Sequence, residues 1–117
     1  MPIYPIVHVE IPAKDREVAG RFYAELCGWT VQQLPEMGYA TFEVEGGPRG
    51  GFPTIDGEMV KPREIMVYIA SDNLDATLAK ATELGGKTVV EKTPIPGIGF
   101  FGIFEDPSGN RIGIFER

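Results

Sequence analysis

The chain has little of what several kinds of site require: one cysteine, one histidine and one tryptophan in 117 residues. A single cysteine, Cys27, can form no intrachain disulfide and excludes a cysteine-based zinc site. Because Cys27 is expected near the end of a helix, away from the helix N-termini that favour reactive thiols, we expect it to be a buried or half-buried small hydrophobe. Basic residues are also few, with 11 Lys and Arg against 17 Asp and Glu and a formal net charge of −6. Because an acidic chain repels phosphate backbones, no nucleic-acid partner is expected.

Long apolar runs and a targeting segment are also missing. No stretch is long enough to span a membrane, and Met1 leads into strand-like sequence without the basic flank and apolar core of a signal peptide. Hydrophobic residues make up 43% and charged residues 24%, a balance that excludes disorder. These features predict a cytoplasmic globular protein with no membrane partner, and the length favours a single domain over residues 1–117.

The first half is predicted to begin with a strand over residues 5–11, where side chains alternate between two faces. One face is apolar, consists of Val7, Val9 and Ile11, and is expected to be buried under a helix. The other face carries His8 and Glu10, the only polar side chains of this strand.

A helix and further strands follow in the first half. Asp15 is expected to cap the helix and Gly28 to end it. Its apolar residues recur at helical spacing: Val18, Ala19, Phe22, Tyr23 and Leu26. Two strands are predicted at 29–34 and 39–45, and the glycine-rich segment 46–53 is a possible weak or bulged strand.

The second half repeats this order. We expect a strand at 63–70, a helix capped by Ser71 or Asp72 and ended at Gly85, a strand at 87–92, and a loop at 93–99. The last two strands, 100–105 and 110–116, form a hairpin across a turn at 106–109 that suits type I geometry with a left-handed glycine.

Aligning the two halves in a single register, without gaps, supports a duplication. The identical pairs are Val9/Val67, Ile11/Ile69, Glu25/Glu83, Leu26/Leu84, Gly28/Gly86, Thr30/Thr88 and Val31/Val89. The sequence therefore predicts two βαβββ modules, one over about 1–53 and one over about 63–117, joined by a connection at 54–62.

The motifs HVEIPAKD, FYAELCGW, DNLDATLAKATELGGK and FEDPSGNRIGIFE resemble the glyoxalase/bleomycin-resistance/extradiol-dioxygenase superfamily, also called vicinal oxygen chelate proteins. The resemblance implies an α+β fold in which two tandem βαβββ modules form a curled mixed sheet around a cavity, with the helices outside. It also implies a homodimer. Enzymatic members hold a divalent metal in the cavity, whereas others are metal-free proteins that sequester drugs.

The resemblance also implies where metal ligands would stand, namely on the first and last strands of each module. The four positions are His8, Met66, Gly51 and Gly113, and only His8 is a ligand for such metals. Glu116 falls on the wrong face of its strand to replace Gly113, and a site of His8, Glu10 and Glu43 is a weaker alternative. We therefore expect no cofactor and a metal-poor protein.

A ligand site is predicted where polar residues of the two first strands converge. Its expected members are His8, Glu10, Met66 and Tyr68, the last two through the alignment of the halves. Gly51, Gly102 and Gly113 are expected to leave open volume beside them. The leading hypothesis is a protein that binds a small, partly apolar molecule without the usual metal. Alternatives are a metal-dependent lyase, isomerase or dioxygenase using His8, and a metal-free enzyme with His8 or Glu10 as acid or base.

Overall fold

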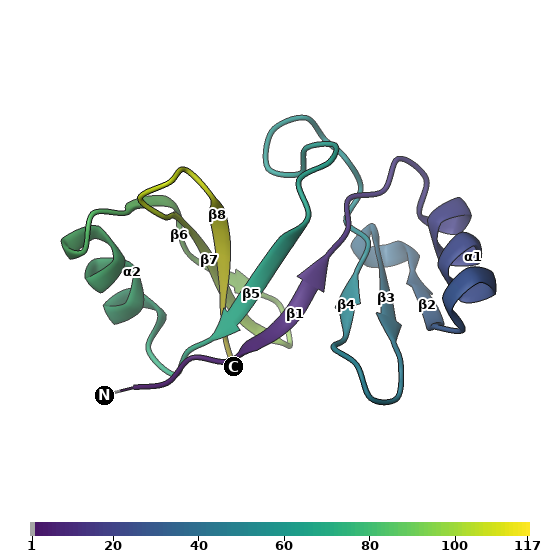
Figure 1. Ribbon diagram of the computed structural model, residues 1–117, viewed down its shortest axis with the longest axis horizontal. Coiled ribbons are helices and arrows are strands. Elements are labelled where there is room, and N and C mark those ends of the chain that lie inside the picture. The colour runs from purple at the N-terminus through teal and green to yellow at the C-terminus, as the bar shows by residue number, and fades with distance from the viewer. Residues whose placement is uncertain (1) are drawn as a thin grey trace. The chain divides into compact units, whose positions relative to one another are not determined.

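The computed structural model describes residues 2–117 and has an α+β fold in which the same order of elements occurs twice (Figure 1). The chain divides into two compact units. One comprises Val7–Met66, and the other comprises Val67–Arg117 together with the segment that ends at Ile6.

The unit Val7–Met66 holds one helix and a four-stranded mixed sheet. Its elements are β1 (Ile6–Glu10), α1 (Arg16–Cys27), β2 (Thr30–Leu34), the short 3-10 helix η1 (Pro35–Met37), β3 (Tyr39–Glu43) and β4 (Gly50–Gly51). The strand order is β2-β3-β4-β1, with β1 and β4 parallel and the other pairs antiparallel. The glycine-rich segment therefore does contain a strand, although it is only two residues long.

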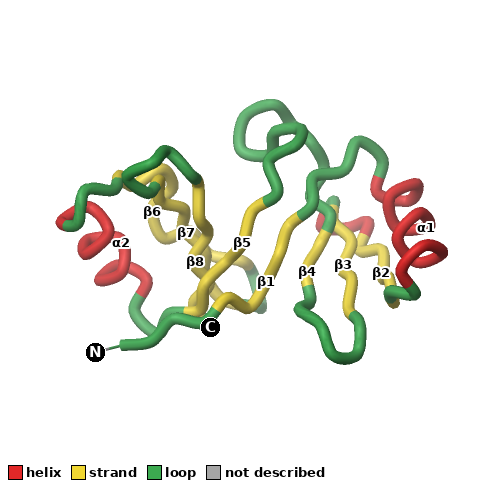
Figure 2. Tube along the Cα trace, viewed as in Figure 1, coloured by secondary structure: helices red, strands yellow, loops and turns green. Residues whose placement is uncertain are grey.

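The second unit has the same plan. Its elements are β5 (Met66–Ala70), α2 (Leu74–Glu83), β6 (Lys87–Ile95), β7 (Gly99–Glu105) and β8 (Arg111–Glu116). The strand order is β5-β8-β7-β6, and β5 and β8 are parallel. The connection that leads to β5 has no helix and is drawn as a long loop in Figure 2.

The pairing registers confirm the predicted duplication. Glu10 pairs with Gly51 in the first unit, and Tyr68, the counterpart of Glu10 in the alignment of the halves, pairs with Gly113 in the second. Gly51 and Gly113 are therefore equivalent positions on the last strands of the two modules.

The helix ends are defined by particular side chains. Asp15 caps α1 as expected, since its carboxylate accepts from the backbone N–H groups of Glu17 and Val18, and Gly28 ends α1 with φ 75°. For α2 the predicted caps Ser71 and Asp72 are wrong. Asn73 is the cap, and its Oδ1 accepts from Ala76 N at 3.1 Å.

The predicted loop at 93–99 is too long, because β6 continues to Ile95 and β7 begins at Gly99. Pro94 pairs with Phe100 within this ladder. A proline has no N–H to donate, but β6 is the last strand in its unit's order, where one side of the strand needs no ladder partner. Only Pro96 to Ile98 form the turn.

Each unit has its own apolar core. In the first unit the buried residues Ala13, Ala40, Phe42 and Phe52 pack with Tyr23 and Trp29. In the second, Leu74, Leu78 and Ile114 form the core. No helix within residues 2–117 combines the length and apolar character needed to cross a membrane.

The buried side of α1 differs from its most apolar side. Gly20 lies against β2, where a Cβ would be 2.9 Å from Val31 Cγ1, and Ala19 and Tyr23 pack on the core. By contrast, Val18, Phe22 and Leu26 are 53%, 56% and 68% exposed. Two further expectations need correction: Cys27 is exposed, and Val7 is 37% exposed, whereas Val9 and Ile11 do pack on the core.

Candidate functional site

His8, Tyr39 and Glu10 form a hydrogen-bonded group, which we call the trio. Tyr39 Oη lies 2.8 Å from His8 Nε2 and donates to Glu10 Oε2 at 2.8 Å. His8 Nε2 and Glu10 Oε2 are 3.5 Å apart, and the two side chains are 29% and 17% exposed. The trio is therefore partly shielded from water and partly exposed at the surface.

Strand alternation and register explain why these side chains meet. Gly51 pairs with Glu10 on one side and with Thr41 on the other, so the three residues share a face of the sheet. His8 lies two residues before Glu10, and Tyr39 two residues before Thr41, which puts both on that same face. Because Gly51 has no side chain, the ring of Tyr39 can cross β4 and reach β1.

Tyr39 is also fixed by its backbone. The 3-10 helix η1 ends at Gly38, which has φ 61°, and β3 starts at the next residue. Arg16, at the start of α1, donates from Nη1 to the carbonyl oxygen of Tyr39 at 3.2 Å. The helix start and the strand start are thus tied together at the residue that carries the phenol.

The bonding pattern of the trio relates the hydrogen on His8 to the one on Tyr39. A phenol has one hydrogen, so when Tyr39 donates to Glu10, His8 Nε2 must carry the proton that points at Tyr39 Oη. Reversing both bonds gives a protonated Glu10 that donates to Tyr39 and a phenol that donates to a bare Nε2. This reversal conserves protons only from the form in which both ring nitrogens of His8 carry a hydrogen, and it then leaves a neutral imidazole and a carboxylic acid.

The expectation that three glycines leave open volume is wrong. A Cβ on Gly51 would overlap the ring of Tyr39, and a Cβ on Gly113 would overlap the ring of Tyr68. Gly102 lies on the helix side of its sheet, where a Cβ would be 2.9 Å from Leu74 Cδ2. Neighbouring side chains therefore fill the space above all three glycines.

The residues present do not fit the divalent metal that the resemblance implies. Met66 is a poor ligand for such metals, and aromatic rings occupy the volume that a ligand side chain at Gly51 or Gly113 would need. Within residues 2–117 there is no group of three or more His, Cys, Asp or Glu side chains able to hold a metal ion.

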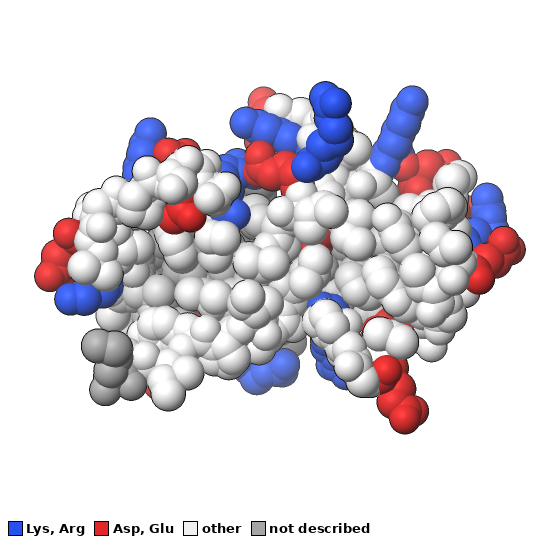
Figure 3. Space-filling model, in the orientation of Figure 1, with Lys and Arg blue, Asp and Glu red and all other residues white. Residues whose placement is uncertain are grey.

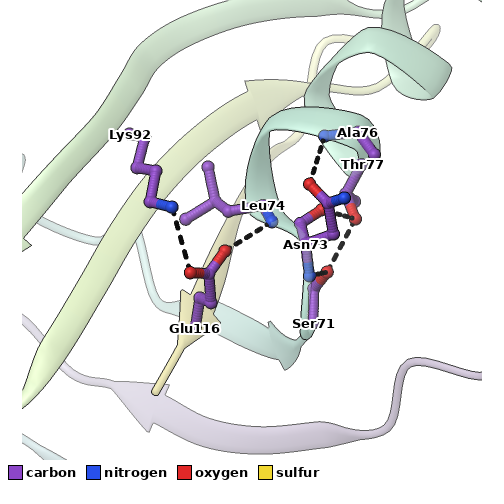
Figure 4. Close-up of polar contacts among 7 residues, drawn as sticks. All are labelled: Ser71, Asn73, Leu74, Ala76, Thr77, Lys92 and Glu116. Carbon is purple, nitrogen blue, oxygen red and sulfur yellow. Dashed lines mark hydrogen bonds and ion pairs between the residues drawn. The ribbon is translucent and has the colours of Figure 1, made fainter.

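The two acidic residues considered as substitute ligands are paired with other groups. Glu43 forms an ion pair with the exposed Arg49 at 3.2 Å. Glu116 Oε1 accepts from Leu74 N at the start of α2 at 2.7 Å, and its Oε2 lies 3.0 Å from Lys92 Nζ (Figure 4). Since Glu116 is on the helix side of β8, it is on the face opposite Gly113, as its spacing predicted.

These two contacts have an electrostatic consequence. The backbone N–H of Leu74, and then the Lys92 ammonium, lower the pKa of the Glu116 carboxyl below its ordinary value of 4.5. Glu116 therefore anchors the end of β8 to the start of α2 as a carboxylate.

Of the predicted site residues, His8 and Glu10 are brought together in the trio. Met66 is buried at the start of β5, and the ring of Tyr68 covers Gly113 in the second unit. A shared role for Met66 and Tyr68 in the ligand site stays a prediction. Sequence reasoning missed Tyr39, and the signal that could have found it is Gly51, whose missing side chain makes room for an aromatic ring from the neighbouring strand.

Comparison with known proteins is consistent with this fold. Residues 8–115 match the family described as "Glyoxalase-like domain". A glyoxylase-like domain-containing protein of Didymella fabae is 33% identical over 120 residues, which cover 93% of this chain and 91% of that protein. The anthracycline biosynthesis protein DnrV of Streptomyces peucetius is 23% identical, and the matched region is 92% of this chain but only 45% of that protein.

Among solved structures, a glyoxalase/bleomycin resistance protein/dioxygenase superfamily member from Vibrio splendidus 12B01 has a TM-score of 0.68. It is 11% identical, and the match covers 98% of this chain and all of that one. This similarity shows the fold and agrees with the resemblance found in the sequence. Because the family match covers nearly the whole sequence and a 33% identical relative matches over most of its length, this chain belongs to the glyoxalase-like domain family.

Proposed function

We propose that the chain binds a small, partly apolar molecule without the usual divalent metal, and that the trio holds the polar end of this molecule. The observation that carries the proposal is the hydrogen-bonded chain from His8 through Tyr39 to Glu10. A few placed polar groups are typical of ligand sites, since they fix the orientation of a mostly apolar ligand. The poor fit of the residues to a metal supports binding without one.

The experiment is a binding titration of the metal-stripped protein. Because one relative is named for anthracycline biosynthesis, an anthracycline is a suitable first probe, together with α-oxo acids and catechols. Tyr39→Phe and Glu10→Gln are expected to weaken binding of a retained probe about tenfold each, which corresponds to ~1.4 kcal/mol. Glu83→Gln, which alters an exposed acid on α2 in the other unit, is the control and should bind like the wild type.

Two outcomes would contradict the proposal. The first is a probe that binds equally well to all three variants, which would put the ligand away from the trio. The second is binding that appears only when a divalent metal is added and disappears with a chelator.

A second candidate is a metal-free acid–base enzyme. It is favoured by one observation, namely that the phenol of Tyr39 is hydrogen-bonded to both an imidazole and a carboxyl group, the two kinds of group that serve as general acids and bases. Turnover of an α-oxo compound in the presence of chelator, lost in Tyr39→Phe, would support it. Binding without turnover would leave the sequestering function as the better account.

A further inference from the structure

We propose that the outward face of α1 is a self-association surface, on which α1 of a second copy of this chain packs antiparallel. The surface is the apolar stripe Val18, Phe22 and Leu26, flanked by Arg21 and Glu25. This inference concerns assembly and does not depend on the proposed ligand site.

The stripe is well exposed and ordered by the helix. Its members are four residues apart, so they follow one side of α1, and they are 53%, 56% and 68% exposed. The central Phe22 ring contacts Tyr23 edge-on, with 5.1 Å between ring centroids, and this contact favours one position of the ring. Fixed, exposed aromatic side chains are common anchors of protein interfaces.

The duplication supplies an internal control for this face. In the alignment of the two halves, Val18 corresponds to Ala76 and Phe22 corresponds to Lys80 on α2. Lys80 points to solvent and pairs with Glu83 at 3.4 Å. Since α2 occupies the equivalent place with a polar centre to its outer face, the fold itself does not require an apolar stripe there. The aromatic centre of the stripe, Phe22, is therefore a property of α1 and not of the fold.

The stripe is complementary to its own copy. In an antiparallel pair with a twofold axis at Phe22, Val18 lies opposite Leu26 of the second copy, because each is four residues from Phe22. The two phenylalanines then meet at the axis. On either side of this aromatic contact, the side chain of Leu26 packs against that of Val18. The line of contact between the two stripes, which we call the seam, then contains no polar side chain.

The charges on the flank are complementary as well. In such a pair, the side of α1 that carries Arg21 and Glu25 lies next to the same side of the second copy. Arg21 of one helix is therefore beside Glu25 of the other, and Glu25 is beside Arg21. Arg21 precedes the axis by one residue and Glu25 follows it by three, which leaves Arg21 and Glu25 of the second copy about 3 Å apart along the helix direction. Figure 3 shows acidic and basic side chains standing together over α1, at the right of the view. Two symmetric ion pairs would therefore form beside the apolar seam.

The test is sedimentation velocity of the full chain between about 1 and about 200 µM, a range in which a modest interface is expected to show mass action. The expected result is a concentration-dependent species of twice the chain mass of 12.8 kDa. Leu26→Glu should weaken the association at least tenfold. The matched control is Leu84→Glu, which alters the equivalent leucine after α2 with the same exposure of 68% and should leave the association unchanged.

A charge reversal identifies the seam directly. Arg21→Glu and Glu25→Arg should each weaken the dimer, because each places like charges side by side, and the double variant should restore it. These exposed substitutions leave the core untouched, and circular dichroism checks that each variant is folded. A chain that stays monomeric up to about 200 µM overturns the proposal, and so does a dimer that Leu26→Glu weakens no more than Leu84→Glu does.

Discussion

The phenol of Tyr39 connects the only histidine of the chain to a carboxylate, so its removal tests the trio most directly. Tyr39→Phe keeps the ring over Gly51 but removes both hydrogen bonds. Because His8 and Glu10 are partly exposed and water can replace the lost partner, we expect a loss of about 1 kcal/mol in the free energy of unfolding. Urea denaturation measures this. A loss above about 3 kcal/mol would mean that the ring had moved, and no loss would mean that the bonds are not formed.

The close approach of Tyr39 to Gly51 gives a second prediction at the same scale. Gly51→Ala places a methyl group inside the space of the Tyr39 ring, so we expect destabilisation of about 1–3 kcal/mol from overpacking. In a Tyr39→Ala background the added cost of Gly51→Ala should be small. If the two substitutions were additive in a double-mutant cycle, the packing of the ring on Gly51 would be refuted.

The sequence predicts those parts of the site that depend on neighbouring residues better than those that depend on pairing between distant strands. His8 and Glu10 follow from alternation along one strand, a local property. Tyr39 joins them only through two ladders that run across a two-residue strand, and the glycine-rich segment around it carries no hydrophobic pattern that fixes register. Side chains that converge from two strands across a third are therefore predictable only in part.

Among the helices and strands, the cap of α2 gives a sharp comparison between two neighbouring residues. Asn73→Ala removes the side chain that accepts from Ala76 N, so we expect a loss of about 1 kcal/mol in stability. Asp72→Ala, one residue earlier, removes an exposed side chain without that contact and should change stability by less than about 0.5 kcal/mol. Equal effects of the two substitutions, measured by thermal or urea unfolding, would contradict the assignment of the cap.

The anchor between β8 and α2 predicts a pH dependence. Since folding lowers the pKa of Glu116, its carboxylate stabilises the fold above the ordinary pKa of 4.5, and the contribution is lost as the pH falls through the lowered value. Glu116→Gln should therefore lower the melting temperature at pH 7, and the difference from wild type should shrink below about pH 4.5.

The comparison between wild type and Glu116→Gln is necessary because other carboxyl groups titrate in the same pH range. Backbone hydrogen bonds also lower the pKa values of Asp106 and Asp56, so the wild type loses stability in the same acidic range for several reasons. The difference between wild type and Glu116→Gln isolates one of them. Glu83→Gln is the control, because Glu83 is exposed and pairs only across one helical turn with Lys80. A difference that stays constant with pH would refute the role of the ionised carboxylate.

The order of helices and strands was predictable, because each strand and helix of the first half has a local pattern and the second half repeats it. The errors have physical causes. Ser71 and Asp72 are good capping residues, but Ser71 is buried and bonded to Thr77, which leaves Asn73 at the cap position. Proline and glycine in 93–99 suggested a loop, but proline is tolerated in a last strand.

For the whole chain, the side chains at the four expected ligand positions predict the metal content of the purified protein. With aromatic rings over Gly51 and Gly113 and a methionine at the equivalent of His8, we expect the protein to retain well under one equivalent of Zn, Mn, Fe or Ni after expression with each metal supplied. Elemental analysis of the purified protein measures this. One tightly held equivalent that is lost in His8→Ala would overturn the expectation.

The crossing of β4 by the Tyr39 ring also limits how this chain could change over evolution. A carboxylate at position 51, where the superfamily resemblance places a metal ligand, cannot be introduced while the phenol occupies that space. The path to such a site is therefore ordered: residue 39 must become small before residue 51 can gain a side chain. Residues 39 and 51 form an epistatic pair, and a selection for metal binding that starts from this sequence should recover the change at position 39 first.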